Sequence, residues 1–210
     1  MGFIAGLDLG QSMDYSALVL IERTQPPKDP LALSRRALPA AYQVRGITRW
    51  PLGTAYPSIV RELTERLSQP PLLDDTQLVV DYTGVGRPCV DMLRQADLRP
   101  VAVSIHGGDS VSHEGLYYRV PKRDLVGTVA VLLQQQRLQI AESLPQTPVL
   151  TQELLNFKVR IDPNTAHDSY SAWREREHDD LVLALALACW YGEYQQGRRA
   201  GTWGYLQLRY

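Results

Sequence analysis

The sequence predicts an α/β domain built on a central mixed sheet of five to eight strands, with helices on its faces. Three observations support this fold class. The N-terminal part holds three apolar segments with short connections, which is typical of an antiparallel meander. The middle alternates short β-branched segments with amphipathic ones, which predicts parallel strands joined by helices. A long apolar segment near the end predicts a helix buried in the core.

The individual elements follow from apolar periodicity and from the prolines and glycines between the segments. The expected strands are residues 3–9, 16–23, 42–50, 77–81 and 100–105. The expected helices are residues 56–67, 87–96, 122–136, 149–157 and 179–193. Loops are expected at 25–39 and 106–116, and a hairpin at 157–161 and 169–173. We expect one domain over residues 1–195 and a tail, without assigned structure, at 196–210.

The cysteines, the N-terminal pattern and the apolar segments favour an intracellular protein without a membrane span. Cys89 and Cys189 lie beside apolar residues without a Cys or His partner at metal-binding spacing, so we expect buried, reduced thiols. The N-terminus lacks the pattern of a signal peptide. The longest apolar segment, Leu181–Tyr191, is too short to cross a bilayer. We therefore expect a cytoplasmic protein that has no membrane partner.

Two expected strands end in a carboxylate that precedes a glycine-containing turn. Asp8 lies in "GLDLGQS" (6–12), and Asp81 ends "LVVD" before "YTGVG". In an open α/β sheet, ligands collect outside the carboxyl ends of the strands. If the two strands are neighbours, these acids converge on one site.

A third acidic position opens the last predicted helix, where His178, Asp179 and Asp180 precede an apolar segment. An Asp at a helix start often only caps free backbone N–H groups. However, a helix that is apolar on all sides lies deep in the fold, so its first turn points into the structure. Buried carboxylates without a compensating charge are costly, and a divalent metal offsets that cost.

These carboxylates predict a site for Mg²⁺ or Mn²⁺, which prefer oxygen ligands. Two such ions, about 3.5–4 Å apart, activate a water and stabilise the leaving oxygen of a phosphodiester. We expect Asp8 to bridge both ions and Asp81 to hold one of them. Asp179 or Asp180 completes the set, and the sequence does not rank one above the other.

A rival hypothesis is an ATPase of the actin, hexokinase and chaperone type, because "GLDLGQS" resembles the first phosphate loop of those proteins. Such ATPases need two lobes, which 210 residues scarcely hold. No lysine of this chain lies in a P-loop pattern either. DNA cleavage with Mn²⁺ and hydrolysis of ATP are the two assays that separate the hypotheses.

Four segments resemble, in order, the nuclease domain of phage terminase large subunits: "GLDLGQSMDYSALVLI", "LVVDYTGVGRPCVDML", "VPKRDLVGTVAVLLQQQRLQI" and "HDDLVLALALA". The resemblance implies a ribonuclease H-like fold and a two-metal endonuclease that cuts double-stranded viral DNA during packaging. It implies Asp8, Asp81, Asp179 and Asp180 as catalytic metal ligands, with His178 orienting a ligand or a water. Its candidate partners are a packaging ATPase domain, the portal and the small terminase subunit, in the host cytoplasm.

One departure from that family leaves alternatives open. The full family protein carries an N-terminal packaging ATPase with a P-loop, which this chain lacks. The chain is therefore either an excised nuclease domain or a stand-alone relative. Related alternatives are a nuclease similar to Holliday-junction resolvases and a catalytically inactive docking module.

Basic residues next to these segments are candidate DNA contacts. Lys122 and Arg123 open a predicted helix, and a helix start suits a phosphate. Arg174 and Arg176 precede the acidic helix start. The competing interpretation of Lys122 and Arg123 is a solvated first turn of the helix. The competing interpretation of Arg174 and Arg176 is that they pair with nearby glutamates. Contacts of this kind give sequence-independent, salt-sensitive binding.

Overall fold

A computed structural model describes residues 2–10, 14–25, 39–83, 86–160 and 179–200 of the chain. Its centre is an eight-stranded sheet in the order β6-β7-β5-β4-β1-β2-β3-β8. The strands are β1 (Phe3–Asp8), β2 (Ala17–Thr24), β3 (Ala41–Arg49), β4 (Thr76–Asp81), β5 (Val101–His106), β6 (Ser112–Glu114), β7 (Tyr117–Pro121) and β8 (Leu138–Ile140).

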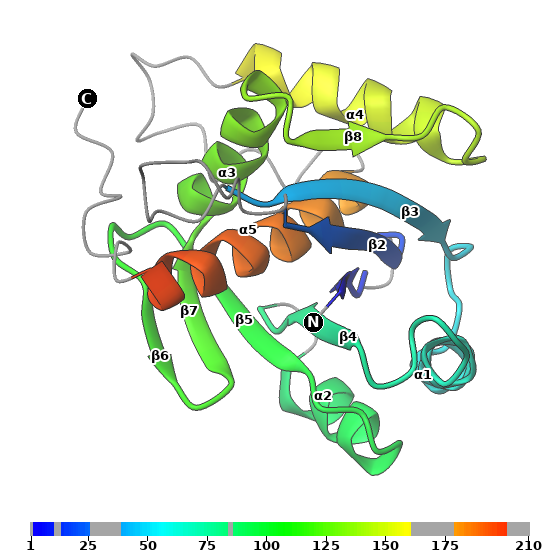
Figure 1. Cartoon of the computed structure of the whole chain (residues 1–210). Helices are drawn as coiled ribbons and strands as arrows, with labels where there is room; N and C mark the ends of the chain where they lie inside the picture. The colour runs from blue at the N-terminus through cyan, green and yellow to red at the C-terminus, as the bar shows by residue number, and fades with distance from the viewer. Residues whose placement is uncertain (1, 11–13, 26–38, 84–85, 161–178, 201–210) are drawn as a thin grey trace.

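Helices cover both faces of this sheet (Figure 1). Those of the described residues are α1 (Tyr56–Leu67), α2 (Gly86–Gln95), α3 (Lys122–Gln134), α4 (Thr147–Arg160) and α5 (Asp180–Ala200). α5 packs against β1, β2 and β4 on one face, and α3 and α4 pack against α5. α1 and α2 cover the opposite face, where their apolar residues form a second core with the strands.

Strand directions confirm the predicted mixed sheet. β1–β2 and β2–β3 are antiparallel, as expected for the N-terminal meander. β4 pairs in parallel with both β1 and β5, and β5 pairs in parallel with β7. Side chains of one strand point alternately to the two faces, so Ile4 joins the core under α5 while Ala5 and Leu7 join the core under α1 and α2. β1 therefore lies at the centre of both cores.

α5 is the buried apolar helix that the sequence predicts. Most of its described residues from Asp180 to Tyr194 are buried, and Trp190 is completely enclosed. A helix that is buried all round needs apolar residues on every side. Its first turn therefore begins inside the molecule, which decides where Asp179 and Asp180 lie.

Several predicted boundaries are wrong. The expected 106–116 loop contains the short strand β6, and β7 and β8 were not predicted. β6 is exposed throughout, so it carries no alternating apolar pattern that could reveal it. The expected strand at 157–161 is wrong because α4 continues to Arg160, with no glycine or proline to stop it. Its proposed partner at 169–173 lies outside the described residues.

The last helix is longer than predicted. α5 continues past Glu193 to Ala200 and includes the first residues of the expected tail. Residues 201–210, and most of the expected loop at 25–39, lie outside the described residues. Both cysteines are buried free thiols, as predicted. Across the described part of the chain, no helix is both long enough and apolar enough to cross a bilayer.

Candidate metal centre at the carboxyl edge of the sheet

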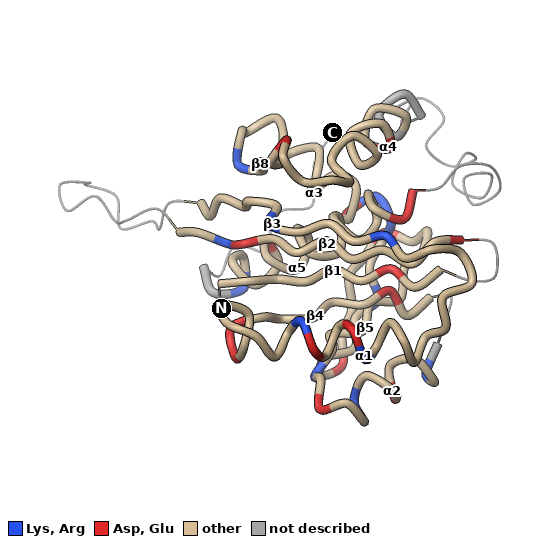
Figure 2. Tube along the Cα trace, turned by 90° about the vertical axis from the view of Figure 1, so that its right-hand side faces the viewer, with Lys and Arg blue, Asp and Glu red and all other residues tan. Residues whose placement is uncertain are grey.

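The register of the sheet brings the two strand-end acids to one edge. β1 and β4 run parallel with Leu7 opposite Val80, so Asp8 and Asp81 are the next residues along the two strands. Figure 2 shows acidic segments at this end of the central strands. Across β2, Asp8 is opposite Ala17, and Ala17 is opposite Arg49 at the end of β3. The same edge therefore carries two acids and an arginine.

A glycine in β1 brings α5 close to this edge. A Cβ atom at Gly6 would collide with the backbone carbonyl of Ala184 in α5. Glycine is thus required in the middle of β1 so that the helix can pack directly on the strand. This close approach explains the first glycine of "GLDLG". It also fixes the start of α5 relative to Asp8.

Buried charge concentrates at this edge. Among the described residues, the polar or charged side chains that are buried are Ser16, Asp81, Glu153 and Asp180. Three of these four are acids of the candidate site. Because buried carboxylates are costly unless they are paired or bind a metal, their concentration here indicates a functional cluster.

Asp8 is surrounded by other acids. Burial raises the pKa of Asp8 well above its usual range, and the charges of Asp81, Asp180, Asp179 and Asp14 raise that pKa further. A carboxyl that is surrounded by other carboxylates ionises reluctantly without a nearby cation. Asp14 was not among the predicted site residues, because it occupies an ordinary turn position before β2.

The N–H groups at the start of α5 are capped by a residue of another helix. Glu153 of α4 accepts hydrogen bonds at Oε2 from the backbone N–H groups of Leu181 (3.1 Å) and Val182 (3.2 Å). These are among the N–H groups that a helix start leaves without an intrahelical partner. Because Glu153 satisfies them, capping those groups does not account for the side chains of Asp179 and Asp180. The capping interpretation is thereby weakened for both aspartates.

Arg49 links Asp180 to Glu153. Its Nη2 donates a hydrogen bond to Asp180 Oδ2 at 2.8 Å, and its Nη1 lies 3.7 Å from Glu153 Oε1. The guanidinium also lies over the ring of Tyr15, 3.9 Å from the ring centroid. Neither Arg49 nor Glu153 was predicted as a site residue, since each has an unremarkable sequence context and meets the acids only in the fold.

The charges of a lysine and of a neighbouring acid both act on Asp179. Burial, together with the charge of Asp180, raises the pKa of Asp179 to about 6, while Lys122 acts in the opposite direction. Lys122, a predicted DNA contact at the start of α3, is thus placed beside the acid cluster. Its neighbour Arg123 is instead held by the loop before β6, through an ion pair with Asp109 at 2.6 Å. The predicted residues Arg174, Arg176 and His178 lie outside the described residues.

The donor set suits Mg²⁺ or Mn²⁺, because it consists of carboxylate oxygens around a site that repels its own negative charge. Some of these oxygens already have protein partners. Asp81 Oδ1 accepts the N–H of Thr83 at 2.7 Å, and Asp180 Oδ2 is paired with Arg49. Within the described ranges, no three His, Cys, Asp or Glu side chains form a ready-made metal cage. The side chains must therefore rearrange before they hold a cation.

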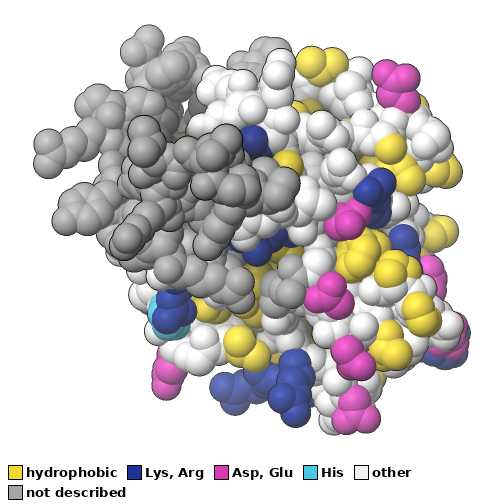
Figure 3. Space-filling view, viewed as in Figure 1, with side chains coloured by type: hydrophobic (Ala, Val, Ile, Leu, Met, Phe, Trp, Pro, Cys, Tyr) yellow, Lys and Arg dark blue, Asp and Glu magenta, His cyan; other side chains and the backbone are white. Residues whose placement is uncertain are grey.

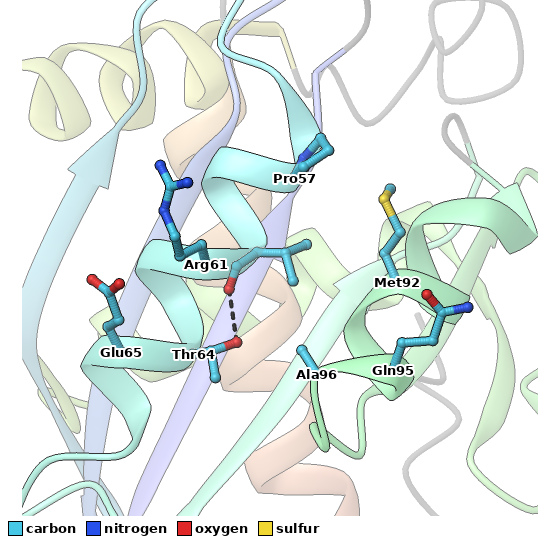
Figure 4. A pocket seen from close by; sticks show the side chains of 8 residues that line it. Pro57, Arg61, Thr64, Glu65, Met92, Gln95 and Ala96 are labelled. Atoms are coloured by element: carbon cyan, nitrogen blue, oxygen red, sulfur yellow. Dashed lines mark hydrogen bonds between the residues drawn. The ribbon is translucent and has the colours of Figure 1, made fainter.

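A separate groove of about 410 Å³ lies between α1 and α2, on the opposite face of the sheet. Figure 4 shows its lining, which includes Pro57 and Arg61 of α1 and Met92 of α2. Thr64 in its wall bonds back to the Val60 carbonyl at 2.8 Å, as hydroxyls within helices often do. None of the candidate acids lines this groove, so it is distinct from the acidic site.

No protein-family model matches the sequence, and a search of curated proteins finds no match. Among solved structures, the chain is similar to the large terminase nuclease from the thermophilic phage G20c, with a TM-score of 0.57 and 17% identity over 89% of this chain and 80% of that one. A Mn-soaked nuclease domain of the human cytomegalovirus terminase matches with a TM-score of 0.49 and 12% identity over 89% and 81% of the two chains. The phage likeness shows that this chain has the ribonuclease H-like fold of a terminase nuclease.

Proposed function

We propose that this chain is a metal-dependent endonuclease that cleaves double-stranded DNA, as the nuclease of a terminase large subunit does in viral genome packaging. The observation that carries the proposal is the convergence of acids from two strand ends and a helix start at one edge of the sheet. Burial, and then the charges of the other acids, raise the pKa of Asp8 there. The shared fold with the phage G20c nuclease supports the same activity.

The proposed metal ligands are Asp8, Asp81 and one or both of Asp179 and Asp180. When bound, two divalent ions supply an activated water and stabilise the leaving oxygen of the phosphodiester. Asp8, whose carboxyl is influenced by four other acids, would be the ligand shared by both ions. Burial and the charges of four neighbouring acids raise the pKa of the Asp8 carboxyl above its usual range. A divalent cation held at this edge would offset that repulsion.

The proposed DNA contacts begin with Lys122, which is within electrostatic reach of Asp179 and so of the reacting phosphate. Arg123 is about half exposed and is a second candidate at the same helix start. Figure 3 shows basic side chains gathered on the lower part of one face, in the region between the β6–β7 hairpin and α2. His178, Arg174 and Arg176 remain predicted contributors. A packaging ATPase, the portal and the small terminase subunit remain proposed partners.

Replacing one acid tests the proposal. Asp8→Asn retains the shape of the side chain but removes its charge, so nicking of supercoiled plasmid in Mn²⁺ should fall by more than about 100-fold, beyond the loss typical of changes outside the ligand shell. Asp91→Asn, which alters a half-exposed acid on α2, is the matched control and should cut at the wild-type rate. Chelation of the metal should abolish cutting. Equal cutting by wild type and Asp8→Asn would contradict the proposal.

Substrate competition separates the proposed function from its alternatives. A packaging nuclease should cleave linear duplex at least as well as a four-way junction of the same sequence. A strong preference for the junction would favour a resolvase and overturn the packaging assignment. Hydrolysis of ATP without DNA cleavage would overturn the nuclease assignment.

A further inference from the structure

Arg49 lies between two buried carboxylates and donates a hydrogen bond to only one of them. On one side it donates to Asp180 Oδ2 at 2.8 Å. On the other it faces Glu153 Oε1 at 3.7 Å, beyond hydrogen-bond length. Glu153 Oε1 is buried and accepts no hydrogen bond from any described residue. The side chains of Glu153 and Asp180 are only 7% and 5% exposed.

The contacts of the Arg49 guanidinium allow it to shift from Asp180 toward Glu153. Its face rests on the Tyr15 ring, which holds its plane but imposes no hydrogen-bond direction. Its Nε is buried and makes no hydrogen bond within the described part of the chain. Closing the gap to Glu153 Oε1 requires a shift of only about 1 Å, to reach the length of a charge-assisted hydrogen bond.

Resting on the metal site proposed above, we propose that Arg49 is an exchangeable internal counter-ion of that site. Without a divalent ion it neutralises Asp180. When Asp180 becomes a metal ligand, Arg49 transfers to Glu153 Oε1, which accepts no hydrogen bond from the part of the chain that the structure describes. Arg49 and Glu153 are thus positioning residues that set how readily Asp180 is released to the metal.

The transfer preserves the charge balance of a buried region. Removing the cationic partner of a buried acid is strongly destabilising, because the acid keeps its charge away from water. In the metal-free state Asp180 has Arg49, while Glu153 is supported by two backbone N–H groups. In the metal-bound state the metal replaces Arg49 at Asp180, and Arg49 serves Glu153. At no stage does a buried arginine lose all carboxylate contact.

The test measures Mn²⁺ affinity by calorimetry. Arg49→Met keeps the apolar stem and removes the competing charge, so it should bind Mn²⁺ roughly tenfold more tightly, as the loss of one charge-assisted hydrogen bond predicts. Glu153→Gln keeps an oxygen for the α5 N–H groups but removes the alternative partner of Arg49, so it should bind Mn²⁺ roughly tenfold more weakly. Arg45→Met, on the exposed side of β3 and paired with Glu22, is the matched control and should bind as wild type does.

The double variant separates exchange from the general effect of adding or removing a charge near a cation. If Glu153 acts through Arg49, Glu153→Gln should have no effect on Mn²⁺ affinity in the Arg49→Met background. Independent charges would give additive changes instead, and that result would overturn the exchange. Unchanged affinity in either single variant would also overturn it. If wild type binds no Mn²⁺, the metal site itself is wrong, whereas binding with additive changes refutes only the exchange.

Discussion

The Glu153 carboxyl caps α5 and borders the acid cluster at the same time. Burial, with the charge of Asp180 adding to it, raises the pKa of Glu153 to about 7, despite the opposing effects of Arg49 and the two N–H donors. Asp8 and Asp179 are shifted in the same direction. Each of these acids therefore binds a proton more tightly in the folded protein than in the unfolded chain. Ionising them in the fold lowers the stability of the protein.

This predicts a pH dependence of folding in the absence of metal. The folded state binds a proton at Glu153 more tightly than the unfolded chain does, since the pKa is raised from 4.5 to about 7. The associated stabilisation is complete at low pH and is lost as pH rises through that interval. The urea midpoint of the wild type should therefore decrease between about pH 5 and about pH 8 in EDTA. In Glu153→Gln the decrease should be smaller, and an identical decrease would contradict the assignment.

Single residues also show the limits of inference from sequence. Asp8 and Asp81 could be placed together because strand ends in a parallel pair share an edge of the sheet. Arg49 could not, because its proximity to Asp180 depends on the pairing of β2 with β3 and on the position of α5. Glu153 resembles any polar residue of an amphipathic helix, and only its burial distinguishes it.

Among the elements, α5 does most to assemble the site, and its contact with β1 depends on Gly6. The helix carries Asp179 and Asp180 at its start and packs on β1, β2 and β4. Its apolar sequence predicts its burial, but the strand on which it packs follows only from the fold. For α1 the sequence was sufficient, because the periodicity of its apolar residues predicts the observed bounds, Tyr56–Leu67. The short strands β6 and β8 escape prediction because three residues carry too little pattern.

Gly6→Ala tests this packing. The added methyl group would meet the backbone of Ala184, which cannot move aside as a flexible side chain can. We expect a loss of about 1–3 kcal/mol or more in the free energy of unfolding, as for other overpacked cores. The control is Gly127→Ala in α3, where a Cβ atom meets open space. There alanine should stabilise the helix by about 0.5–1 kcal/mol, and equal effects at the two sites, measured by urea unfolding, would contradict the account.

In the whole molecule, one sheet with a core on each face holds the acidic edge in place. The parallel β1–β4 pair aligns Asp8 with Asp81, and the antiparallel β1–β2–β3 meander places Arg49 at the same edge. The order of strand and helix segments in the sequence was sufficient to predict the mixed sheet. It was not sufficient to predict β7 or β8, which extend the sheet on either side and whose pairing is set by contacts distant in sequence.

The most direct test of the central claim is a crystal structure of the chain with bound Mn²⁺, in which anomalous scattering locates the ion. We expect Mn²⁺ between Asp8 and Asp81, with Asp180 or Asp179 completing the ligands and Arg49 turned toward Glu153. Asp8→Asn crystals grown in the same way should lack the ion at this edge. Wild-type crystals with Mn²⁺ only at other sites, or with no Mn²⁺ at a saturating concentration, would contradict the claim that these acids form the metal centre of a nuclease.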